Sequence, residues 1–356
     1  MRRFPVIFHN DGVAGVKTLA VSPIRIRGTH RALGQQLGEL ARPIMADYLA
    51  QSVTWQALQA WRGHAFIAAL GSQIQQHLPT IWQELIGMAE ALDKPLDDVL
   101  LWHCRGDVLH AVNEGCTTIA AHSGDSILIA HNEDGDPFLL GRCFMVEVEL
   151  DDAPGFTSFY YPGSLPGHTF AVNNAGIVQT INNLRLAEPR SGVPRQILAR
   201  AVLDCPTLDD TLGLLCDSPR SGGFHHTLAQ VGDARLLSVE LTPIRCSVQV
   251  IDEHFAHANH LVHEQADRQL QIVTRSSARR QARIDHCLSA LPANPPLMAL
   301  SIALTDCTDN LLPIYRCDPD DPDGENTLAR AGFNLTSAQV ELSVAIYNSR
   351  SSQQHG

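Results

Sequence analysis

The stretch Asn113-Glu114-Gly115-Cys116-Thr117-Thr118 divides the sequence into two parts of different character. Before it, from residue 29 to about 112, apolar residues recur three and four positions apart, as they do in amphipathic helices. After it, short strand-like segments alternate with turn residues, which is typical of antiparallel strands joined by tight connections. The change of period therefore places Cys116 at the start of the first strand of a strand-rich region.

The predicted elements follow one another in blocks. Helices are expected at 29–41, 55–70, 74–92, 96–112, 193–204, 208–216, 266–291 and 297–304. Strands are expected at 117–122, 126–131, 145–150, 158–161, 169–173, 177–182, 227–231, 236–241, 245–251, 255–259, 327–333 and 340–347. Strand-rich and helical blocks that are separated in this way indicate an α+β fold, with two antiparallel sheets and helices packed outside them.

Composition excludes several classes of protein. The 356 residues are 44% hydrophobic and 18% charged, enough for a substantial core, and the net charge of −12 argues against a general nucleic-acid binder. The nine cysteines are scattered and contain no C-x-x-C pair, so we expect neither a disulfide framework nor a thiolate zinc site, and we infer a reducing compartment. The apolar run at the N-terminus is too short for a signal peptide, and no run approaches the length of a membrane span. A soluble cytoplasmic protein without membrane or nucleic-acid partners is expected.

Cys116 is the first candidate for chemistry. A cysteine at the start of a strand is more often a small buried apolar group than a nucleophile. However, Gly115 has no Cβ, so its peptide can adopt a strained conformation that lets a following thiol approach its carbonyl. Thr117 and Thr118 add hydroxyls near the same bond, and Thr117 is also a candidate substrate contact. A thiol is largely protonated at neutral pH, so a nucleophilic Cys116 requires a base or cation nearby.

The motifs around Cys116 resemble those of a known family. Asn-Glu-Gly-Cys-Thr-Thr at 113–118, followed by His131-Asn132-Glu133-Asp134, resembles the acyl-CoA:6-aminopenicillanic acid acyltransferase family (peptidase family C45) of the N-terminal nucleophile hydrolases. Val172–Ile177, Ser191–Pro194 and His257–His260 are similar to later motifs of that family. The resemblance implies a four-layer αββα sandwich that is made as an inactive precursor.

The resemblance also implies self-cleavage. The Cys116 thiol would attack the Gly115 carbonyl and break the Gly115-Cys116 bond. A helical N-terminal segment, 1–115, would then stay packed on a catalytic core, 116–356. The new α-amine of Cys116 would serve as the base for its own thiol, because an α-amine has an unperturbed pKa of about 7.7–8.0.

Further site residues follow from the same resemblance. Asp134 is expected close to the nucleophile, although by itself it is typical of a turn acid in the polar loop 132–136. Asn259 is expected to donate its amide to the oxyanion of the tetrahedral intermediate, and Asn182 to assist. Arg316 is expected to hold a carboxylate or a polar acyl acceptor.

Two other patterns have simpler interpretations. His254, His257, His260 and His263 recur every third residue, but on a strand such spacing points successive side chains to opposite faces, which disfavours a metal site. Arg275, Arg279 and Arg283 recur four apart, as on a solvated helix face.

The sequence thus predicts an enzyme that cleaves or transfers the acyl group of a small-molecule amide through a Cys116 thioester. No cofactor is expected, although an acyl-CoA would be a substrate if the enzyme transfers acyl groups. Two alternatives remain: a metal-dependent hydrolase that uses the histidine series, and a non-catalytic, uncleaved ligand-binding protein. Neither the substrate nor the oligomeric state follows from the sequence.

Overall fold

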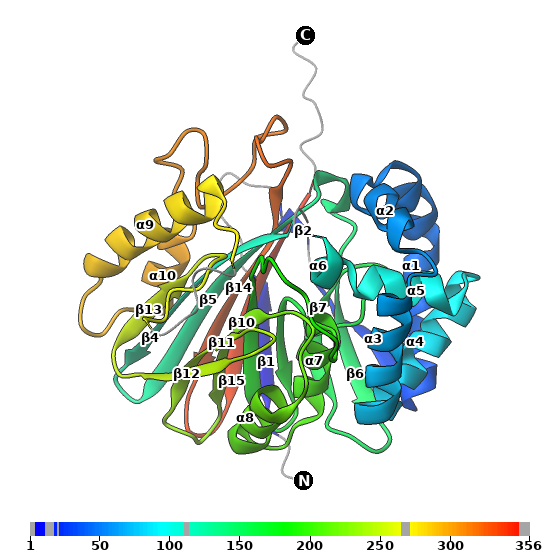
Figure 1. Ribbon diagram of the computed structural model, residues 1–356. Coiled ribbons are helices and arrows are strands. Elements are labelled where there is room, and N and C mark those ends of the chain that lie inside the picture. Colours follow the sequence, from blue (N-terminus) through cyan, green and yellow to red (C-terminus); the bar gives the residue numbers. More distant parts are fainter. Residues whose placement is uncertain (1–3, 11–17, 20, 110–113, 265–270, 349–356) are drawn as a thin grey trace.

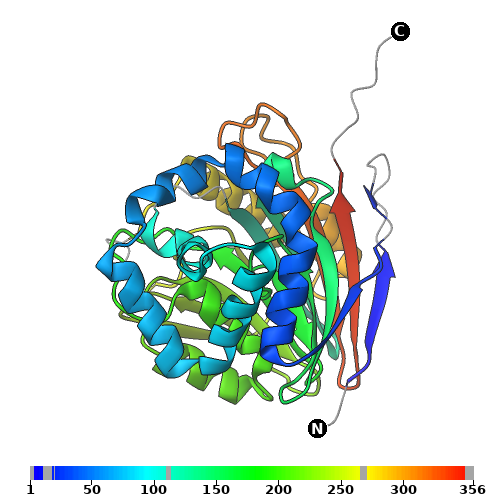
Figure 2. The ribbon, with the colours of Figure 1, turned by 90° about the vertical axis from the view of Figure 1, so that its right-hand side faces the viewer.

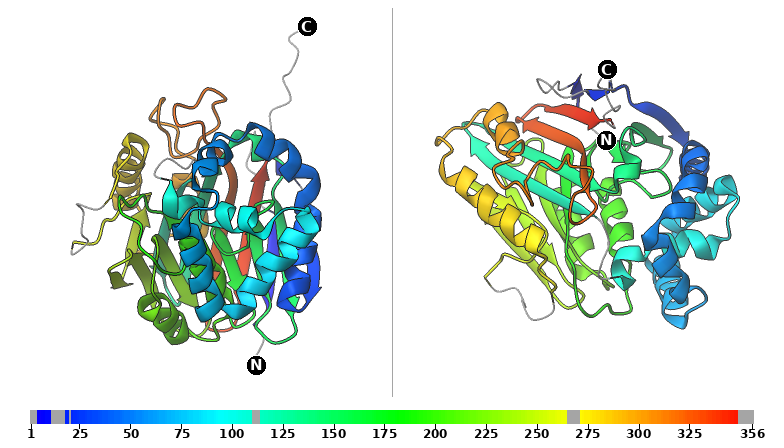
Figure 3. Two further views of the ribbon diagram at one scale, coloured as in Figure 1. Left: turned by 45° about the vertical axis from the view of Figure 1, so that its right-hand side comes forward. Right: turned by 90° about the horizontal axis from the view of Figure 1, so that it is seen from above.

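The computed structural model describes residues 4–10, 18–19, 21–109, 114–264 and 271–348. Two sheets lie face to face, and helices cover both outer sides (Figure 1). Helices α9 and α10 lie on one side, and the helices of the N-terminal third lie on the other, which the view from above also shows (Figure 3). This arrangement confirms the predicted α+β class and the αββα layers.

The first sheet contains the segment that begins with Cys116. Among the described residues its order is β1 (Val6–Asn10), β15 (Val340–Tyr347), β14 (Asn326–Leu335), β5 (Ser126–Gly135), β4 (Gly115–Ser123) and β13 (His254–His257), with β2 (Thr18–Leu19) also on β15. The second sheet has the order β12 (Cys246–Ile251), β11 (Leu236–Leu241), β10 (Phe224–Gln230), β9 (Ile177–Asn183), β8 (Phe170–Asn173), β7 (Phe156–Tyr160), β6 (Phe144–Leu150) and β3 (Ile24–Gly28).

Strands from the N-terminal segment extend both sheets, and the sequence analysis did not predict them. β1 pairs with β15, and β3 pairs with β6, both in parallel, whereas the remaining strand pairs are antiparallel. Figure 2 shows blue β1 beside red β15 at the edge of the molecule. Parallel partners are far apart in the chain and need no hairpin turn, so no local turn signal marks these strands.

The helices occupy most of the predicted ranges. They are α1 (His30–Gln51), α2 (Val53–Leu58), α3 (Ala65–His77), α4 (Pro79–Leu92), α5 (Leu96–His103), α6 (Arg105–Val108), α7 (Arg195–Ala201), α8 (Leu208–Asp217), α9 (Arg275–Ser289) and α10 (Leu297–Ala303), with short 3-10 turns at Gln59–Trp61, Pro137–Leu139 and Val202–Asp204. Thr29 caps α1 by accepting from the Ala32 amide. The predicted helix 55–70 is interrupted before Ala65, where Gly63 has a positive φ of 72°.

The position of β4 between layers gives its two faces different neighbours. Thr118 donates to Asn182 on β9, so this face of the strand looks into the space between the sheets. Thr117 accepts from Arg280 on α9, and Ile119 packs in an apolar cluster with Ile284 and Leu300 under α9 and α10. Because side chains alternate along a strand, Cys116 points the same way as Thr118, toward the second sheet.

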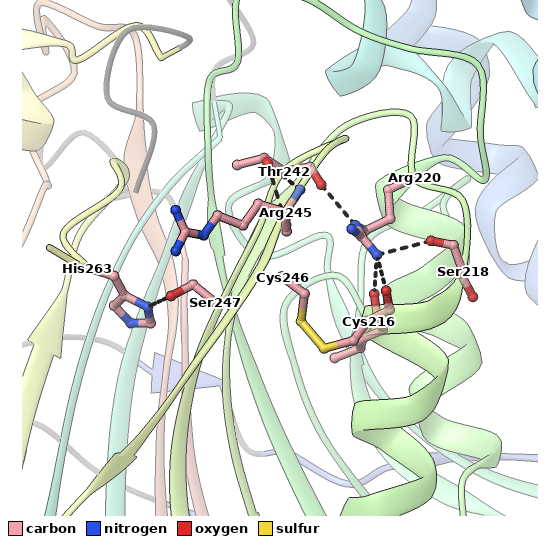
Figure 4. Close-up of a disulfide and its surroundings, with 9 residues drawn as sticks. Cys216, Ser218, Arg220, Thr242, Arg245, Cys246, Ser247 and His263 are labelled. Atoms are coloured by element: carbon pink, nitrogen blue, oxygen red, sulfur yellow. Dashed lines mark hydrogen bonds between the residues drawn. A yellow bond between two sulfur atoms is a disulfide. The ribbon is translucent and has the colours of Figure 1, made fainter. Parts of the chain in front are cut away.

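A disulfide links Cys216 at the end of α8 to Cys246 at the start of β12, with 5.2 Å between the Cα atoms (Figure 4). The expectation of no disulfide is therefore wrong for this pair. The two cysteines are 30 residues apart in the sequence, and only the packing of α8 beside the edge of the second sheet brings them together. The other seven cysteines are free.

No helix among the described residues is long and apolar enough to cross a membrane.

Helices α1 and α4 approach so closely that glycine is required between them. A Cβ at Gly87 would lie 2.1 Å from the Arg31 carbonyl oxygen, and one at Gly34 would lie 1.9 Å from the Glu84 carbonyl oxygen. Both obstacles are backbone atoms of the facing helix, so an added methyl group would force the two helices apart.

We therefore expect Gly87→Ala to lower the free energy of unfolding by about 1–3 kcal/mol, the usual cost of overpacking. Gly213→Ala in α8 is the matched control, because its Cβ would have no neighbour closer than 3.9 Å. There the better helix propensity of alanine should raise the stability by up to about 1 kcal/mol. Urea denaturation followed by circular dichroism measures both, and equal effects at the two positions would contradict the close approach.

Candidate active site

Cys116 is buried at the start of β4, and the side chain of Asn259 contacts both its backbone nitrogen and its sulfur. Its backbone N–H donates to Asn259 Oδ1 at 3.1 Å, and Asn259 Nδ2 donates to Cys116 Sγ at 3.3 Å. Gly115 and Cys116 are joined in the structure, so these are contacts of the uncleaved chain. Asn259, which the sequence analysis assigned to the oxyanion, thus contacts Cys116 directly.

Arg280 on α9 holds this arrangement from the other side of β4. Its guanidinium donates to the Cys116 carbonyl at 2.7 Å, to Thr117 Oγ1 at 2.9 Å and to Asn259 Oδ1 at 2.6 Å. The side chain is buried, with 1% of Arg280 exposed. Such a fully hydrogen-bonded guanidinium fixes the position of the Asn259 amide relative to the thiol.

The sequence analysis missed Arg280. It considered the neighbouring arginines of the same helix, and the structure pairs two of these, Arg279 and Arg283, with Asp309 and Asp306 near the surface. The buried residues of α9 recur three and four apart, and they are Ser276, Ser277, Arg280, Gln281 and Ile284. An arginine on the face that carries serines and an isoleucine is the signal that could have identified it.

Gly115 lies against a buried carboxylate. A Cβ at this position would be 2.4 Å from Glu325 Oε2, which Arg316 holds at 2.7 Å. Burial raises the pKa of Glu325 to about 7, although Arg316 and Arg185 oppose the shift. The residue before the nucleophile therefore has no room for a side chain unless Glu325 moves.

The thiol of Cys116 is protonated in this form of the protein. Burial, and next the nearby Glu133 carboxyl, raise its pKa well above the ordinary value, whereas the backbone N–H of Asn183, the Asn259 amide and Arg280 lower it less. The surroundings provide hydrogen-bond donors for an anion but do not ionise the thiol. A base is therefore still needed, as the sequence analysis concluded.

Glu133 lies opposite Cys116 in the pairing of β4 with β5. Tyr161 donates its hydroxyl to Glu133 Oε1 at 2.8 Å, and His131 Nε2 is 3.0 Å from Glu133 Oε2. Burial raises the pKa of Glu133 well above the ordinary value of a glutamate and lowers the pKa of His131 to about 3.

The hydrogen bonds around Glu133 and His131 indicate which of the two side chains carries the proton that they share. Thr118 donates its only hydroxyl hydrogen to Asn182 Oδ1 at 2.7 Å, so it accepts from His131 Nδ1 at 2.8 Å. His131 then carries its hydrogen on Nδ1, and its Nε2 accepts from Glu133. Glu133 is consequently a neutral acid beside the thiol, and it is not the missing base.

Asp134 lies opposite Gly115 in the strand pairing and is completely buried. Thr327 donates to its Oδ1 at 2.6 Å, whereas no partner among the described residues contacts Oδ2. Burial raises the pKa of Asp134, and Arg280 and Arg316 oppose this shift. The structure therefore places the predicted Asp134 opposite Gly115, and among the described residues only Oδ1 of its carboxyl group accepts a hydrogen bond.

Of the adjacent asparagines Asn182 and Asn183, the second contacts the scissile segment. Asn183 Nδ2 donates to the Glu114 carbonyl at 3.0 Å, and its backbone N–H faces the Cys116 thiol. Asn182 instead bonds to Thr118 and to the His257 carbonyl in the space between the sheets. The sequence alone does not show which of the two asparagines lies near Glu114. Their side chains point to opposite faces of β9, and only the packing of β9 decides what each face contacts.

Arg316 is buried among acids of the chain itself. It donates to Asp321, to Asp323 at 3.1 Å, to Glu325 at 2.7 Å and to the Ser276 hydroxyl at 3.0 Å. These partners engage all three nitrogens of its guanidinium. A role for Arg316 in binding a substrate carboxylate stays a prediction, and in this structure its contacts support the loop before β14.

Two histidines of the series lie beside the same acid: His257 is 3.2 Å and His263 is 3.8 Å from Glu240. His260 instead bonds to Ser277, and His263 also bonds to Ser238 and Ser247. Among the residues that the structure describes, no three His, Cys, Asp or Glu side chains form a group that could hold a metal ion.

A small cavity of about 20 Å³ lies beside the residue that precedes the scissile pair. Its lining residues are Tyr48, Thr54, Trp102, Arg105, Glu114, Asp136, Leu139, Tyr161, Pro162 and Ser164. Tyr161 connects this cavity to the site, because its hydroxyl bonds to Glu133 opposite Cys116. The cavity therefore borders Glu114, the residue before Gly115.

We expect Arg316→Gln to lower the free energy of unfolding by about 3–5 kcal/mol, because buried acids would lose their counterion. Urea denaturation should be measured in a Cys116→Ala background, in which the chain cannot be cut at residue 116. The control is Arg283→Gln, which removes a solvent-screened pair with Asp306 and should lower the stability far less. Equal losses for the two variants would refute the structural role of Arg316.

Comparison with known proteins shows similarity over most of the chain. The model of the family described as "Acyl-coenzyme A:6-aminopenicillanic acid acyl-transferase" matches residues 120–347. The "Beta-alanyl-dopamine/carcinine hydrolase" of Drosophila melanogaster is 23% identical over 363 residues, which cover 91% of this chain and 92% of that protein. A crystal structure of a variant of conjugated bile acid hydrolase from Clostridium perfringens is 10% identical, with a TM-score of 0.42, over 64% of this chain and 92% of that chain.

The family model matches from Ala120, within β4 and four residues after Cys116, to the end of β15, and the fly hydrolase is similar over nearly the whole length of both chains. The motifs that follow Cys116 in the sequence, including Asp134 and Asn259, fall inside the matched range. The chain therefore belongs to the acyl-coenzyme A:6-aminopenicillanic acid acyl-transferase family.

Proposed function

We propose that the protein is a self-processing cysteine amidohydrolase, which first cleaves its own Gly115-Cys116 bond and then hydrolyses a small-molecule amide through a Cys116 thioester. The observation that carries this proposal is the double contact of Asn259 with the nitrogen and the sulfur of Cys116. A structural cysteine has no need for a fully buried amide on its sulfur, held by a buried guanidinium.

Processing begins with the attack of Cys116 Sγ on the Gly115 carbonyl carbon. The new C–S bond replaces the C–N bond, and the proton of the thiol passes to the departing nitrogen of Cys116. Water then hydrolyses the thioester, which leaves a carboxylate on Gly115 and a free α-amine on Cys116. The absence of a Cβ at Gly115 keeps the path to this carbonyl open, since Glu325 occupies the adjacent space.

The mature site uses the amine that processing creates. The nitrogen of Cys116 already lies 3.1 Å from Asn259 Oδ1, so the same contact would orient the α-amine. With an unperturbed pKa of about 7.7–8.0, this amine can take the thiol proton near neutral pH. Asn259 Nδ2 and the Asn183 backbone N–H, which both face the sulfur, can donate to the oxyanion of a bound amide.

Hydrolysis is preferred over transfer because the fly relative is named as a hydrolase and matches 91% of this chain. We therefore propose that water is the acceptor, that no cofactor takes part, and that the cleaved N-terminal segment stays bound as a partner of the core.

Cys116→Ala should abolish both cleavage and turnover, because no other group in the site can form the thioester. Denaturing gels with N-terminal sequencing detect cleavage, and the hydrolysis of a panel of N-acyl amines, followed by mass spectrometry, measures turnover. Cys307→Ala is the matched control, since this exposed thiol lies outside the site, and it should process and turn over normally. An active wild-type preparation that remains a single chain would refute the mechanism.

Asn259→Ala should slow processing and lower kcat of the processed enzyme by about 10²- to 10³-fold, as the loss of one oxyanion donor does. KM should change less, because the donor acts mainly on the charge of the transition state. Asn334→Ala on β14 removes only a partly buried bond to Glu341 and serves as the control. A kcat within about twofold of wild type would remove Asn259 from the catalytic group.

A further inference from the structure

We propose that the mature site binds an acyl group that ends in a carboxylate, which Arg105 holds in the place that Glu114 occupies before cleavage. This inference rests on the proposed function, because it names the class of amide that the Cys116 site takes.

Glu114 is bound tightly by a buried cation. Arg105 Nε and Nη2 both approach Glu114 Oε1 at 2.6 Å, and Arg195 Nη2 lies 3.9 Å from Oε2. Arg105 is 4% exposed, and its remaining nitrogen donates to the Trp102 carbonyl at 3.0 Å and to Gln196 at 2.9 Å. The guanidinium therefore lies in a fixed position, and one of its edges is devoted to a carboxylate.

The chemistry of the two reactions puts the substrate where Glu114 now lies. In self-cleavage, the acyl group on Cys116 Sγ is the chain that ends in Glu114-Gly115. In turnover, the acyl group of the substrate forms a thioester with the same sulfur and uses the same oxyanion donors. The two acyl groups must then extend from the sulfur in the same direction, so the surroundings of Glu114 are those of the substrate acyl group.

The residues that line the cavity beside Glu114 include aromatic side chains, one cation, Arg105, and one further acid, Asp136. The cavity beside Glu114 is bounded by Tyr48, Trp102 and Tyr161, and the Arg105 guanidinium lies over the Trp102 ring at 4.6 Å. Aromatic walls fit the methylene chain of an acyl group, and the guanidinium fits its end. Departure of Glu114 would enlarge this cavity by the volume of its side chain.

Charge balance favours an anionic occupant. Burial works against the ionisation of Glu114, but Arg105 and Arg195 overcome it and lower the pKa, so the pocket holds an anion in the uncleaved chain. Once the cut end withdraws, Arg105 is a buried cation without its acid, which is an unfavourable state. A substrate carboxylate restores the pair, and an acyl group that ends in an ammonium would repel it.

The number of bonds between the Gly115 carbonyl carbon and the Glu114 carboxyl carbon defines the length of the substrate acyl group. The path from the Gly115 carbonyl carbon through Gly115 and the Glu114 side chain to its carboxyl carbon has the same number of bonds as the path between the two carboxyl carbons of suberic acid. Arg105 precedes the cleavage site, so the bound N-terminal segment would supply a substrate-binding residue to the mature enzyme.

The test compares three tyramine amides with acyl chains of equal length: N-suberoyl, N-octanoyl and N-(8-aminooctanoyl). Processed wild-type enzyme should have a kcat/KM for the suberoyl amide about 10- to 100-fold above that for the octanoyl amide, the range expected for hydrogen bonds to a charged group. The aminooctanoyl amide should be the poorest. The inference is overturned if the octanoyl or the aminooctanoyl amide is the best of the three.

Two variants show whether Arg105 is responsible. The double variant Arg105→Gln/Glu114→Gln removes both charges of the pair together. It should lose the preference for the suberoyl over the octanoyl amide, because its KM for the suberoyl amide rises. Glu114→Gln alone should keep the preference, because Glu114 is outside the pocket in the mature enzyme. If the double variant does not mature, Arg105→Lys should raise KM for the suberoyl amide and not for the octanoyl amide. A preference that all these variants retain overturns the assignment.

Failure of the proposed function gives a different result. If Cys116 is never found at a chain terminus, the catalytic proposal fails, and the inference fails with it because Glu114 stays on Arg105. If the chain is processed but no amide is hydrolysed, only the catalytic proposal fails. Calorimetry with suberic acid monoamide on the processed wild-type protein then decides the inference by itself. Binding that Arg105→Lys weakens would support it, and absence of binding would overturn it.

Discussion

The contact between Asn259 and Cys116 is the interaction on which the site depends. One amide accepts from the nitrogen and donates to the sulfur of the same residue, and Arg280 fixes its orientation from α9. Three segments that are distant in the sequence therefore meet at one peptide bond. Because each group satisfies a hydrogen bond of another in a buried place, moving any one of them leaves an unpaired polar group.

The layered fold makes such a meeting possible. β4 lies inside the first sheet between β5 and β13, with helices on one face and the second sheet on the other, so both faces of Cys116 and its neighbours are dry. In these surroundings the thiol, Glu133 and His131 are all held neutral by burial. The charges that remain are arginines that the acids of the chain surround, as Arg316 is by Asp321 and Glu325. A low dielectric with preorganised donors is the condition under which an oxyanion is stabilised most.

The N-terminal segment is part of this architecture as well as a predicted product of cleavage. Its strands β1 and β3 extend both sheets, and α1 packs on α4 at a distance that requires glycines. Arg105 also lines the cavity beside the site. The strand pairs and the contact between α1 and α4 explain how a cut N-terminal segment could remain attached to the core.

The amino-acid sequence by itself determined the order of most elements, because local periodicity and turn residues report local structure. It also indicated the family, because the motifs at Gly115–Thr118, His131–Asp134 and His257–His260 can be recognised from the order of residues alone. The parallel strands β1 and β3, the disulfide between Cys216 and Cys246, and the choice of Asn183 over its neighbour at the scissile segment were decided only by the tertiary structure. So were the burial of Arg280 against Cys116 and the enclosure of Arg316 by acids. Each of these depends on which distant segments pack together, and a pattern of neighbours along the chain carries no record of that packing.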